Sequence, residues 1–494
     1  MPDPAQPSPS TRLIIIGAGF AGIGLGLKLL ERGERDFLIL EQAEGIGGTW
    51  WVNRYPGCAC DVQSHLYSLS FAPKADWSQQ FAPREEIQAY LQTLVDRSGL
   101  SRHIRLGTPV RQARWQEDKQ AWRIIVGAGE TIECSVLVSA IGGLSRPNRP
   151  AIPGLEQFAG PVIHSQEWPE DFDPTGQRVA VIGSGASAIQ FVPRIQPKVA
   201  RLDLYQRTPQ WILPKPDRPI SARWQAAYRH VPGLRLARRL AIYLLLETRL
   251  PAFSHFPSLS RLHRGQARRL LARQVDNPDL RAKLTPEYAM GCKRVLMSND
   301  FYPAVAADNC EVITTPIARL EPGAIIDTEG NRREVDSVIL ATGFKATAPV
   351  PGGLIIGREG LDLAEHWKDG PMAYKGTTVH GYPNLFTLLG PNTALGHNSV
   401  LLMIEAQIRY LLEALDYLQQ SDVRSLEVHA NCQAAWNDQL QEKLARTVWN
   451  RGGCASWYRH PVSGRNATLW PRWTWRFAQL TRHFDPAAYR PGRD

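Results

Sequence analysis

Two glycine-rich segments, each preceded by a short apolar run, constrain this chain of 494 residues more than any other feature. The first reads GAGFAG at residues 17–22 and the second reads GSGASA at 183–188. Each follows a run of β-branched and aliphatic residues, at 12–16 and at 178–182, and precedes a helix-like pattern. A strand, a glycine loop and a helix in this order are typical of a dinucleotide-binding fold. Two such units predict two nucleotides in one chain, of which one can reduce the other.

The first loop is predicted to hold the pyrophosphate of a dinucleotide. Gly17 permits the tight turn, Gly19 lets the backbone approach the phosphates, and Gly22 lets the helix pack closely on the strand. The helix that follows offers free N–H groups and the positive end of its dipole. Glu41 ends the next strand, where its carboxylate can accept hydrogen bonds from a ribose diol and repels a 2′-phosphate. This loop is therefore predicted to take FAD or NAD rather than NADP.

The second loop differs from the first in the residues that follow its second strand. It ends in Ala188, which the fingerprint tolerates, and no acid follows the strand. Arg207 and Thr208 lie instead where the ribose 2′ position is expected. A guanidinium can bind a phosphate there through two parallel hydrogen bonds. We predict an NADPH site, with a surface salt bridge of Arg207 as the alternative.

The expected fold class is α/β, with two Rossmann-like dinucleotide-binding domains and a helical insertion. A chain of this length exceeds one ordinary hydrophobic core. Two further apolar strands that run into glycine, within 134–142 and 336–344, are expected to carry the chain between the domains. A long helix is predicted from Ser399 to Leu418, capped by Ser399. The predicted division assigns residues 1–150 and 338–494 to the first (FAD) domain, 151–215 and 285–337 to the second (NADPH) domain, and 216–284 to the insertion.

The insertion is strongly basic. Residues 218–283 contain 14 Lys and Arg against 3 acids, a net charge of 14 − 3 = +11, which exceeds the +10 of the whole chain. Between 234 and 246 the arginines alternate with Leu and Ala, which predicts an amphipathic helix with a cationic face. Such a face is ordinarily solvated. Weak contact with an anionic membrane surface or an acidic partner is the sharper alternative, and nucleic acid is not expected as a partner.

Cysteine usage and terminal sequence predict a cytoplasmic protein. Seven cysteines, an odd number with no paired framework, favour a reducing compartment, and Cys58 and Cys60 are expected to be buried thiols rather than a redox pair. No apolar run is long enough to span a membrane. Residues 1–12 lack a signal-peptide pattern and are expected to form a short disordered leader. No metal-binding motif is present, so no metal is expected.

Three further motifs surround the nucleotide loops. Residues 158–169 have the spacing F-x-G-x-x-x-H-x-x-x-W-P. Residues 47–61 read GGTWWVNRYPGCACD, and residues 291–295 read GCKRV, with DFYP following at 300–303. Together these segments resemble the motifs of type I Baeyer–Villiger monooxygenases, and the resemblance extends from about residue 12 to 478.

This resemblance implies an enzyme that depends on FAD, NADPH and O2. Such an enzyme takes a hydride from NADPH, activates O2 as a C4a-peroxyflavin, and inserts one oxygen atom beside a ketone carbonyl. The product is an ester or a lactone, and NADP⁺ is expected to stay bound. The many aromatic and aliphatic residues, 15 Trp among them, favour a small apolar ketone as substrate. A monomer is expected.

The resemblance also assigns catalytic roles. Arg294 is expected to be catalytic and Asp61 to orient it, while Lys293 contacts NADPH and Trp457 covers it. A fixed cation stabilises negative charge that develops on oxygen, and arginine does not become a proton donor near neutral pH. A structural ion pair between domains is the alternative for Arg294 and Asp61. Further FAD contacts are expected from Phe20, Ala21, Gly48, Thr49, Trp50, Tyr55, Val62, Tyr67 and Val110, and NADPH contacts from Gly183, Ser184, Gly185, Ala186 and Ser187.

The segment between the two loops is expected to act as a hinge. We assign His164 a hydrogen-bonding role there, with Phe158 and Trp168 packing the linker and with Gly160 and Pro169 completing the fingerprint. Histidine is a frequent general base, but oxygen insertion requires no side chain to remove a substrate proton. A buried core histidine is the other alternative. Residues 390–399, a polar loop before the long helix, could place N–H groups near the flavin or could form a plain capped loop.

Other classes of protein share part of this pattern. A flavin-containing monooxygenase that oxidises sulfur or nitrogen has both loops and a similar linker, and the Trp168–Pro169 ending and the Arg294–Asp61 pair favour the ketone oxidiser over it. A flavoprotein reductase or electron-transfer protein is a more remote alternative, because it needs a C-x-x-C motif near the flavin that this chain lacks. A nucleotide sensor without catalysis is the last alternative.

Overall fold

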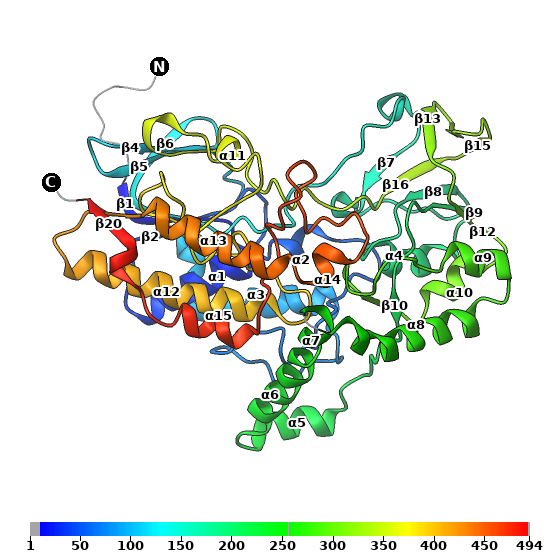
Figure 1. The fold of residues 1–494 in the computed structure, drawn as a ribbon, viewed down its shortest axis with the longest axis horizontal. Coiled ribbons are helices and arrows are strands. Elements are labelled where there is room, and N and C mark those ends of the chain that lie inside the picture. Colours follow the sequence, from blue (N-terminus) through cyan, green and yellow to red (C-terminus); the bar gives the residue numbers. More distant parts are fainter. Residues whose placement is uncertain (1–9, 255, 493–494) are drawn as a thin grey trace.

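Two β-sheets with helices packed around them form the molecule in the computed structural model, which describes residues 10–254 and 256–492 (Figure 1). The larger sheet has eight strands in the order β17-β4-β5-β6-β1-β2-β3, with β18 also paired to β6. Its central strands β6, β1 and β2 are parallel, and β4 and β5 form an antiparallel meander with β6. The bounds are β1 Ser10–Ile16, β2 Phe37–Leu40, β3 Ile104–Arg105, β4 Val110–Gln116, β5 Ala121–Val126, β6 Glu130–Ser139, β17 Ile355–Ile356 and β18 Leu385–Thr387.

The second sheet is entirely parallel, in the order β12-β9-β8-β16-β7. A three-stranded antiparallel sheet, β13-β14-β15, adjoins it, and two short pairs, β10-β11 and β19-β20, lie elsewhere. The bounds are β7 Val162–His164, β8 Arg178–Ile182, β9 Arg201–Tyr205, β10 Ile212–Leu213, β11 Leu296–Met297, β12 Cys310–Ile313, β13 Ile317–Glu321, β14 Ala324–Asp327, β15 Arg332–Glu334, β16 Ser337–Leu340, β19 Ser425–Val428 and β20 Tyr489–Gly492.

Helices cover the first sheet and fill the insertion. Helix α1 packs between α3 and α12 against the first sheet, and α4 packs against α10 beside the second. The bounds are α1 Phe20–Glu31, α2 Thr49–Val52, α3 Arg84–Ser98, α4 Ala188–Ile195, α5 Ala222–His230, α6 Leu234–Glu247, α7 Leu250–Ser254, α8 Ser260–Gln274, α9 Pro278–Lys283, α10 Phe301–Val305, α11 Leu363–His366, α12 Val400–Gln420, α13 Ala430–Leu444, α14 Val448–Arg451 and α15 Thr474–Leu480. The 3-10 helices are η1 Leu100–His103, η2 Leu155–Gln157, η3 Ser165–Glu167, η4 Pro257–Leu259, η5 Arg358–Gly360 and η6 Pro486–Ala488.

The predicted fold class is confirmed: two sheets with parallel strands after which the glycine loops turn are present, and the region of the insertion is helical. The strands of the first sheet come from residues 10–139 and 355–387, and those of the second from residues 162–340. The exact division into domains stays a prediction. The long helix starts where it was expected, with the Ser399 Oγ accepting the N–H of Leu401 at 3.4 Å, and it ends two residues later than expected, at Gln420.

The strands expected within 134–142 and 336–344 are present, end at Ser139 and Leu340, and run into glycine-containing loops, as predicted. Two expectations need correction. The cationic exposed face expected for α6 is wrong, because its exposed residues are Leu and Ala. Paired cysteines were not expected, yet Cys292 is bonded to Cys454. The other five cysteines are free, and Cys58 and Cys60 are buried thiols, as predicted.

Residues 1–9 of the expected leader lie outside the described part of the chain, and its last three residues, 10–12, belong to β1 instead. Within the described ranges, no helix is both long and apolar enough to cross a membrane.

Candidate functional site

The first glycine loop connects β1 to α1 and is built so closely that only glycine fits. Gly17 has φ +108°, and a Cβ there would lie 2.7 Å from the carbonyl oxygen of Ala140. A Cβ on Gly22 would lie 1.9 Å from the carbonyl oxygen of Gly17. The turn and the close contact between helix and strand that the sequence predicted are therefore both present.

Glu41 follows β2 and is buried beside this loop. Its Oε2 accepts the N–H of Ala18 at 2.7 Å, and its Oε1 accepts the N–H of Ala43 at 2.9 Å. The backbone thus fixes the carboxylate in the position expected for a ribose acceptor. Val110 begins β4 nearby, two residues after Thr108, whose N–H donates to the carbonyl of Glu41 at 2.8 Å.

The segment 47–61 packs directly against the first loop. A Cβ on Gly48 would lie 3.1 Å from the Cα of Gly19, so the two backbones are in close contact at glycine. Next to this contact, at the start of α2, Trp50 donates its indole N–H to the hydroxyl of Tyr67 at 3.2 Å. The ring of Phe20 meets that of Tyr67 edge-on at 5.3 Å. The segment 47–61 thus closes over the loop that is predicted to hold the pyrophosphate of FAD. The expected contacts Ala21 and Val62 are buried, and Thr49 begins α2.

The second glycine loop repeats the construction of the first. Gly183 has φ +107°, and a Cβ there would lie 2.5 Å from the carbonyl oxygen of Ala341. A Cβ on Gly185 would meet no protein atom within 4 Å, so the chain leaves this side of the loop open. Ala188 begins α4, and the Ser184 Oγ donates to the carbonyl of Thr208 at 3.4 Å. Ala186 and Ser187 complete the loop between them.

Two cations lie near each other at this loop, and neither pairs with a carboxylate among the described residues. Arg207 is exposed, and its side chain has no hydrogen bond or ion pair with any described residue. Burial is the main cause that lowers the pKa of Lys293, and the positive charge of nearby Arg207 lowers it further. The Nζ of Lys293 lies 5.3 Å from the ring centre of Tyr288. Repulsion between the two cations would be relieved by an anion, so the residues present fit a phosphate.

Arg294 and Asp61 come together from segments 233 residues apart and form a two-point ion pair. The Nε of Arg294 donates to Oδ2 of Asp61 at 2.6 Å, and Nη2 donates to Oδ1 at 2.7 Å. About a third of each side chain is exposed, at 31% and 34%. Burial acts to raise the pKa of Asp61, but the charge and hydrogen bonds of Arg294 outweigh it and lower that pKa. The Asp61 carboxylate in turn raises the pKa of Arg294.

Two residues close to this pair were not predicted to be there. Burial, opposed by the charge of Arg294, raises the pKa of Tyr458 to about 12. Arg249, which directly precedes α7, lies close enough to feel both charges. Burial lowers the pKa of Arg249, the negative charge of Asp61 raises it, and the positive charge of Arg294 lowers it further. Tyr458 directly follows Trp457, a position that could have suggested it. Nothing in the sequence marked Arg249 among the arginines of the insertion.

A third unpredicted residue, Gln190 of α4, joins the two nucleotide units. Its Oε1 accepts the hydroxyl proton of Tyr55 at 2.9 Å, and its Nε2 donates to the carbonyl of Ala59 at 2.9 Å. Tyr55 is thereby tied to the second unit, and the segment that carries Asp61 is held against α4.

Trp457 is 40% exposed, and its ring contacts that of Tyr458 at 4.5 Å. The disulfide between Cys292 and Cys454 joins the segment of Trp457 to the segment that carries Lys293 and Arg294. The disulfide thus holds the partly exposed segment of Trp457 beside the segment of Lys293 and Arg294.

The linker between the loops is tied to the end of β16 through His164. This fully buried residue donates from Nε2 to the carbonyl of Gly343 at 3.1 Å, and its Nδ1 accepts the N–H of Gln166 at 3.2 Å. These partners require a neutral ring, and burial lowers its pKa accordingly. A Cβ on Gly160 would lie 2.1 Å from the carbonyl oxygen of Asp336.

The aromatic residues of the linker are buried on either side of His164. Phe158 packs in the core of the second unit. Trp168 meets the rings of Phe172 and Phe191 at 5.5 and 5.4 Å, and Pro169 follows it.

The loop 390–399 is anchored by Glu247 at the end of α6. The Oε1 of this buried carboxylate accepts the side-chain N–H of Asn398 at 2.7 Å, and the Nε2 of His397 lies 3.5 Å away. Burial acts to raise the pKa of Glu247, but hydrogen bonds from His397 and Thr474 lower it. Glu247 thus fixes the loop in addition to the Ser399 cap, and both alternatives, a contact with flavin and a plain capped loop, stay predictions.

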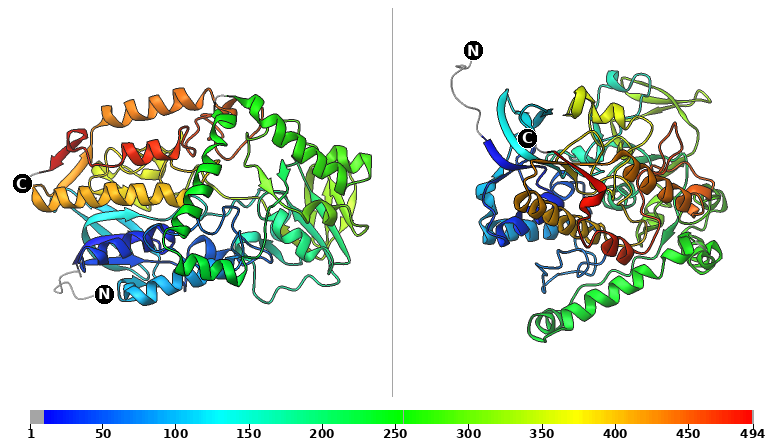
Figure 2. Two further views of the ribbon diagram at one scale, coloured as in Figure 1. Left: turned by 90° about the horizontal axis from the view of Figure 1, so that it is seen from below. Right: turned by 60° about the vertical axis from the view of Figure 1, so that its left-hand side comes forward.

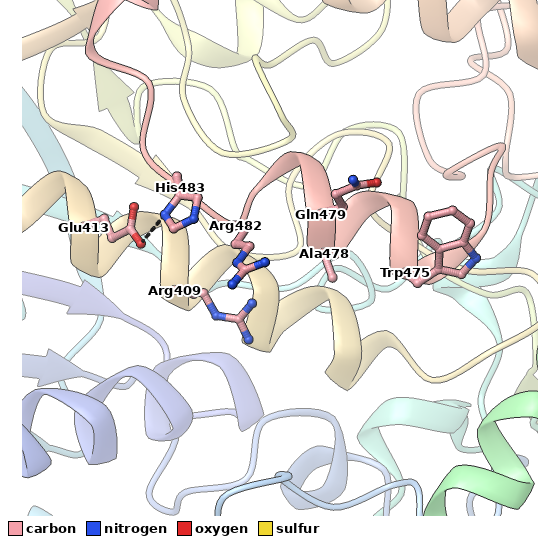
Figure 3. Close-up of a pocket in the computed structure, with 7 residues that line it drawn as sticks. All are labelled: Arg409, Glu413, Trp475, Ala478, Gln479, Arg482 and His483. Atoms are coloured by element: carbon pink, nitrogen blue, oxygen red, sulfur yellow. Dashed lines mark hydrogen bonds and ion pairs between the residues drawn. The ribbon is translucent and has the colours of Figure 1, made fainter.

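A shallow hollow between α12 and α15 contains none of the predicted site residues. Its lining includes Arg409, Glu413, Trp475 and Arg482, with His483 close to Glu413 at 3.3 Å (Figure 3). It lies beside the helices rather than at either glycine loop, so we do not assign it to the nucleotide chemistry.

Comparison with known proteins agrees with this geometry. The family model for pyridine nucleotide-disulphide oxidoreductases matches residues 14–229. A Baeyer–Villiger monooxygenase of Pseudomonas aeruginosa is 51% identical over 98% of this chain and 93% of its own length. Another, of Streptomyces coelicolor, is 44% identical over 97% and 92%.

Solved structures lead to the same family. The closed crystal structure of cyclohexanone monooxygenase matches with a TM-score of 0.88 and 26% identity, over 99% of this chain and all of that one. Oxidized steroid monooxygenase bound to NADP matches with a TM-score of 0.85 and 28% identity, over 98% and 100%. Two nucleotide loops, the joined Asp61 and Arg294, and two close relatives over nearly full length lead to one conclusion: this chain belongs to the Baeyer–Villiger monooxygenase family.

Proposed function

We propose that Arg294, held by Asp61, supplies the fixed positive charge for oxygen insertion in this enzyme. The enzyme is an FAD- and NADPH-dependent monooxygenase that inserts an oxygen atom next to a ketone carbonyl, giving an ester or a lactone. The single observation that carries the assignment is the two-point contact between Arg294 and Asp61, at 2.6 and 2.7 Å. The carboxylate aims the guanidinium and leaves about a third of it exposed toward a ligand.

The proposal places FAD at the first glycine loop and NADPH at the second. Glu41, fixed by two backbone N–H groups, suits a ribose diol and disfavours a 2′-phosphate. Arg207 and Lys293, two neighbouring cations without acid partners, suit that phosphate, with Thr208 beside them. When bound, FAD supplies the redox chemistry that accepts a hydride and reacts with O2.

Arg294 provides a positive charge at the site, and two tyrosine hydroxyls near it stay neutral. Because guanidinium stays protonated near neutral pH, Arg294 stabilises negative charge on oxygen without giving up a proton. Tyr458, buried and with its pKa raised to about 12, stays a neutral hydroxyl beside the pair. Tyr67, whose pKa burial also raises, does the same on the side of the first loop.

The proposal also includes a small apolar ketone as substrate and a monomeric, cytoplasmic protein. Aromatic and aliphatic residues near the site favour an apolar substrate, while Arg249 adds a second cation that a polar group of the ketone could contact. Five free cysteines favour a reducing compartment, and the Cys292–Cys454 bond counts against it. Light scattering of the purified holoenzyme and fractionation of the source cells would measure assembly and location.

The test compares Arg294→Ala with the wild-type holoenzyme in stopped-flow absorbance. We expect the variant to retain FAD and its reduction by NADPH, but to form ester from a panel of ketones about 10²- to 10³-fold more slowly. Arg194→Ala is a matched control, because this arginine forms an exposed ion pair with Asp300 at 3.3 Å in the same unit. Ester formation at the wild-type rate in Arg294→Ala would refute the catalytic assignment.

The same experiment separates the rival functions. Oxidation of sulfides or amines by the wild type, with no ester from any ketone, would favour the heteroatom-oxidising class. Rapid reoxidation of the flavin to give H2O2, without any oxygenated product, would favour an oxidase or a reductase. Mass spectrometry with ¹⁸O2 identifies which product has received an atom of oxygen.

A further inference from the structure

Helix α6 presents its apolar side to solvent and its arginines to the protein. Its exposed positions are 236, 237, 240, 241, 244 and 245, occupied by Leu, Ala, Leu, Ala, Leu and Leu. These positions follow the i, i+1, i+4, i+5 spacing of one helical face. The four leucines are 70%, 51%, 53% and 55% exposed. An ordinary surface helix has the reverse arrangement, with its apolar stripe toward the core.

The inward-facing arginines explain the direction of the helix. The Nη1 of Arg239 donates to the carbonyls of His65, Leu66 and Ser68 at 3.2, 3.1 and 2.9 Å. Its Nη2 lies 3.8 Å from Glu405 of α12. These contacts hold the inner face of α6 against the first unit, so the leucines on the opposite face cannot turn inward.

Helix α5 contacts α6 and exposes further apolar side chains. Trp224 is 55% exposed and stacks on Tyr228 at 5.7 Å, and Val231 at the turn between the helices is 51% exposed. Helices α5 and α6 form a hairpin that projects from the body of the molecule (Figure 1), and α6 lies on the near side when the molecule is seen from below (Figure 2). We call this surface the α5–α6 apolar face: Trp224, Val231, Leu236, Leu240, Leu244 and Leu245.

The segment that carries this face is basic, and Asp76 from another segment pairs with Arg229 of α5 at 3.2 Å. Residues 218–246 contain no Asp or Glu. The exposed side chains of Arg218 and Arg223 form no ion pair with any residue that the structure describes, whereas Arg235 and Arg238 of α6 are half-buried near His65. A second copy of the chain docked on the same face would bring these cations together, which is unfavourable. An apolar stripe with a tryptophan and unpaired arginines instead matches the boundary of an anionic bilayer, with acyl chains below and phosphate headgroups around it.

We propose that the α5–α6 apolar face binds the surface of an anionic lipid membrane. The leucines enter the boundary between headgroups and acyl chains, Trp224 lies at headgroup level, and the unpaired arginines contact lipid phosphates. The protein rests on the bilayer and does not cross it. This binding does not depend on the monooxygenase chemistry and is measured without turnover.

The test is co-sedimentation of the purified holoenzyme with vesicles of phosphatidylcholine, alone or with 30% phosphatidylglycerol (about one anionic lipid in three). We expect binding to the anionic vesicles that weakens as salt rises, and little binding to the neutral ones. Leu240→Asp/Leu244→Asp is expected to reduce the partition constant at least about tenfold. Val462→Asp, which places the same charge on an apolar side chain that is 84% exposed elsewhere, is the matched control and should bind like the wild type.

A second variant keeps the result clear if the aspartates disturb folding. Arg218→Gln/Arg223→Gln leaves the leucines in place and is expected to weaken binding to anionic vesicles about fivefold per arginine. Flavin content and melting temperature are measured for each variant. Equal binding of the wild type and Leu240→Asp/Leu244→Asp would overturn the proposal. Absence of binding by the wild type would overturn it as well, and a dimer in analytical ultracentrifugation that the aspartates dissociate would then show that a second copy covers the face.

Discussion

The two nucleotide loops of this enzyme are built alike where they meet their own sheets. Gly17 packs on the carbonyl of Ala140 beyond β6, and Gly183 packs on the carbonyl of Ala341 beyond β16. Both glycines have nearly the same φ, +108° and +107°. In each unit, a parallel strand brings a carbonyl to the point where the loop turns, so the same backbone contact arises twice from different residues.

The loops differ in how far the chain closes around them. At the first, Gly48 approaches Gly19, and Glu41 is fixed by two backbone N–H groups. At the second, a Cβ on Gly185 would meet no described protein atom within 4 Å, and Arg207 is exposed, with no ion pair to any residue that the structure describes. The first loop is closed and pre-organised, whereas the second is open. We infer that this difference separates a resident flavin from a coenzyme that arrives to deliver its hydride.

The largest expected effect comes from adding one methyl group to each loop. Gly22→Ala places a Cβ 1.9 Å from the carbonyl oxygen of Gly17, so we expect loss of bound FAD and a cost of about 3 kcal/mol in stability. Gly185→Ala meets no protein atom and should keep the wild-type melting temperature while raising KM for NADPH. Flavin content, melting temperature and KM measure the contrast. Equal losses of FAD in both variants would mean that the two loops do not serve different nucleotides.

The next effect concerns the cations at the open loop. We expect Arg207→Ala to raise KM for NADPH about 10- to 100-fold, the range for a charge-assisted phosphate contact. KM for NADH should change less than about twofold, because NADH has no 2′-phosphate. Steady-state NADPH and NADH oxidation measures both constants.

Lys293→Ala tests the second cation of this pair. Since Arg207 lowers the pKa of Lys293, the two charges share one region, and Lys293→Ala should also affect NADPH more than NADH. Arg146→Ala, which removes an arginine bonded only to the carbonyls of Ala348 and Val350, serves as the control. Parallel changes with both coenzymes in Arg207→Ala would show that this residue does not recognise the phosphate.

The sequence was sufficient to predict the loops and the meeting of Asp61 with Arg294. Glycine at fixed spacing reports a backbone constraint that any chain must obey, so Gly17 and Gly183 could be placed before the fold was known. Asp61 and Arg294 lie 233 residues apart, and periodicity alone could not join them. The family motifs joined them, since each occurs within a longer fixed pattern.

Other features could not be predicted because they depend on which faces meet. A helical pattern at 234–246 shows that the leucines of α6 share one face, but not that this face is exposed to solvent. The orientation of the helix is set by Arg239, which donates to three carbonyls of the segment 65–68. Gln190 and Glu247 likewise have roles fixed by distant partners. Spacing gave no reason to pair Cys292 with Cys454 rather than with another cysteine.

A smaller effect is expected on stability at the contact between the two units. Arg294 lowers the pKa of Asp61 below its ordinary 3.8 in the folded protein. The charged carboxylate therefore stabilises the fold above about pH 4, and that contribution is lost as the pH falls through the lowered pKa. Asp61→Asn should reduce the melting temperature at pH 7, and its difference from the wild type should narrow in more acidic buffers.

Asp300→Asn is the control for this pH dependence. It removes the exposed ion pair with Arg194, whose side chains are both 56% exposed, and such pairs contribute about 0–1 kcal/mol. Thermal unfolding from pH 3 to pH 7 measures both variants against the wild type. A difference for Asp61→Asn that stays constant across this range would contradict a carboxylate held charged by Arg294.

The smallest expected effect is at His164, on the linker between the units. Its neutral ring donates to Gly343 and accepts from Gln166, and burial lowers its pKa below 6.5. The neutral form stabilises the fold above the unfolded pKa, and this contribution is lost as the pH falls through the lower, folded pKa. His164→Gln retains a side-chain N–H donor and should cost about 1 kcal/mol, whereas His164→Ala removes it and should cost more. If His164 only positions the linker, the pH profile of kcat stays unchanged in His164→Gln between pH 6 and 9 (about the range in which a histidine base would titrate). If His164→Gln instead lost the acidic limb of the kcat–pH profile, His164 would act as a proton acceptor in the reaction. The linker between the two units would then take part in catalysis and not only in their contact.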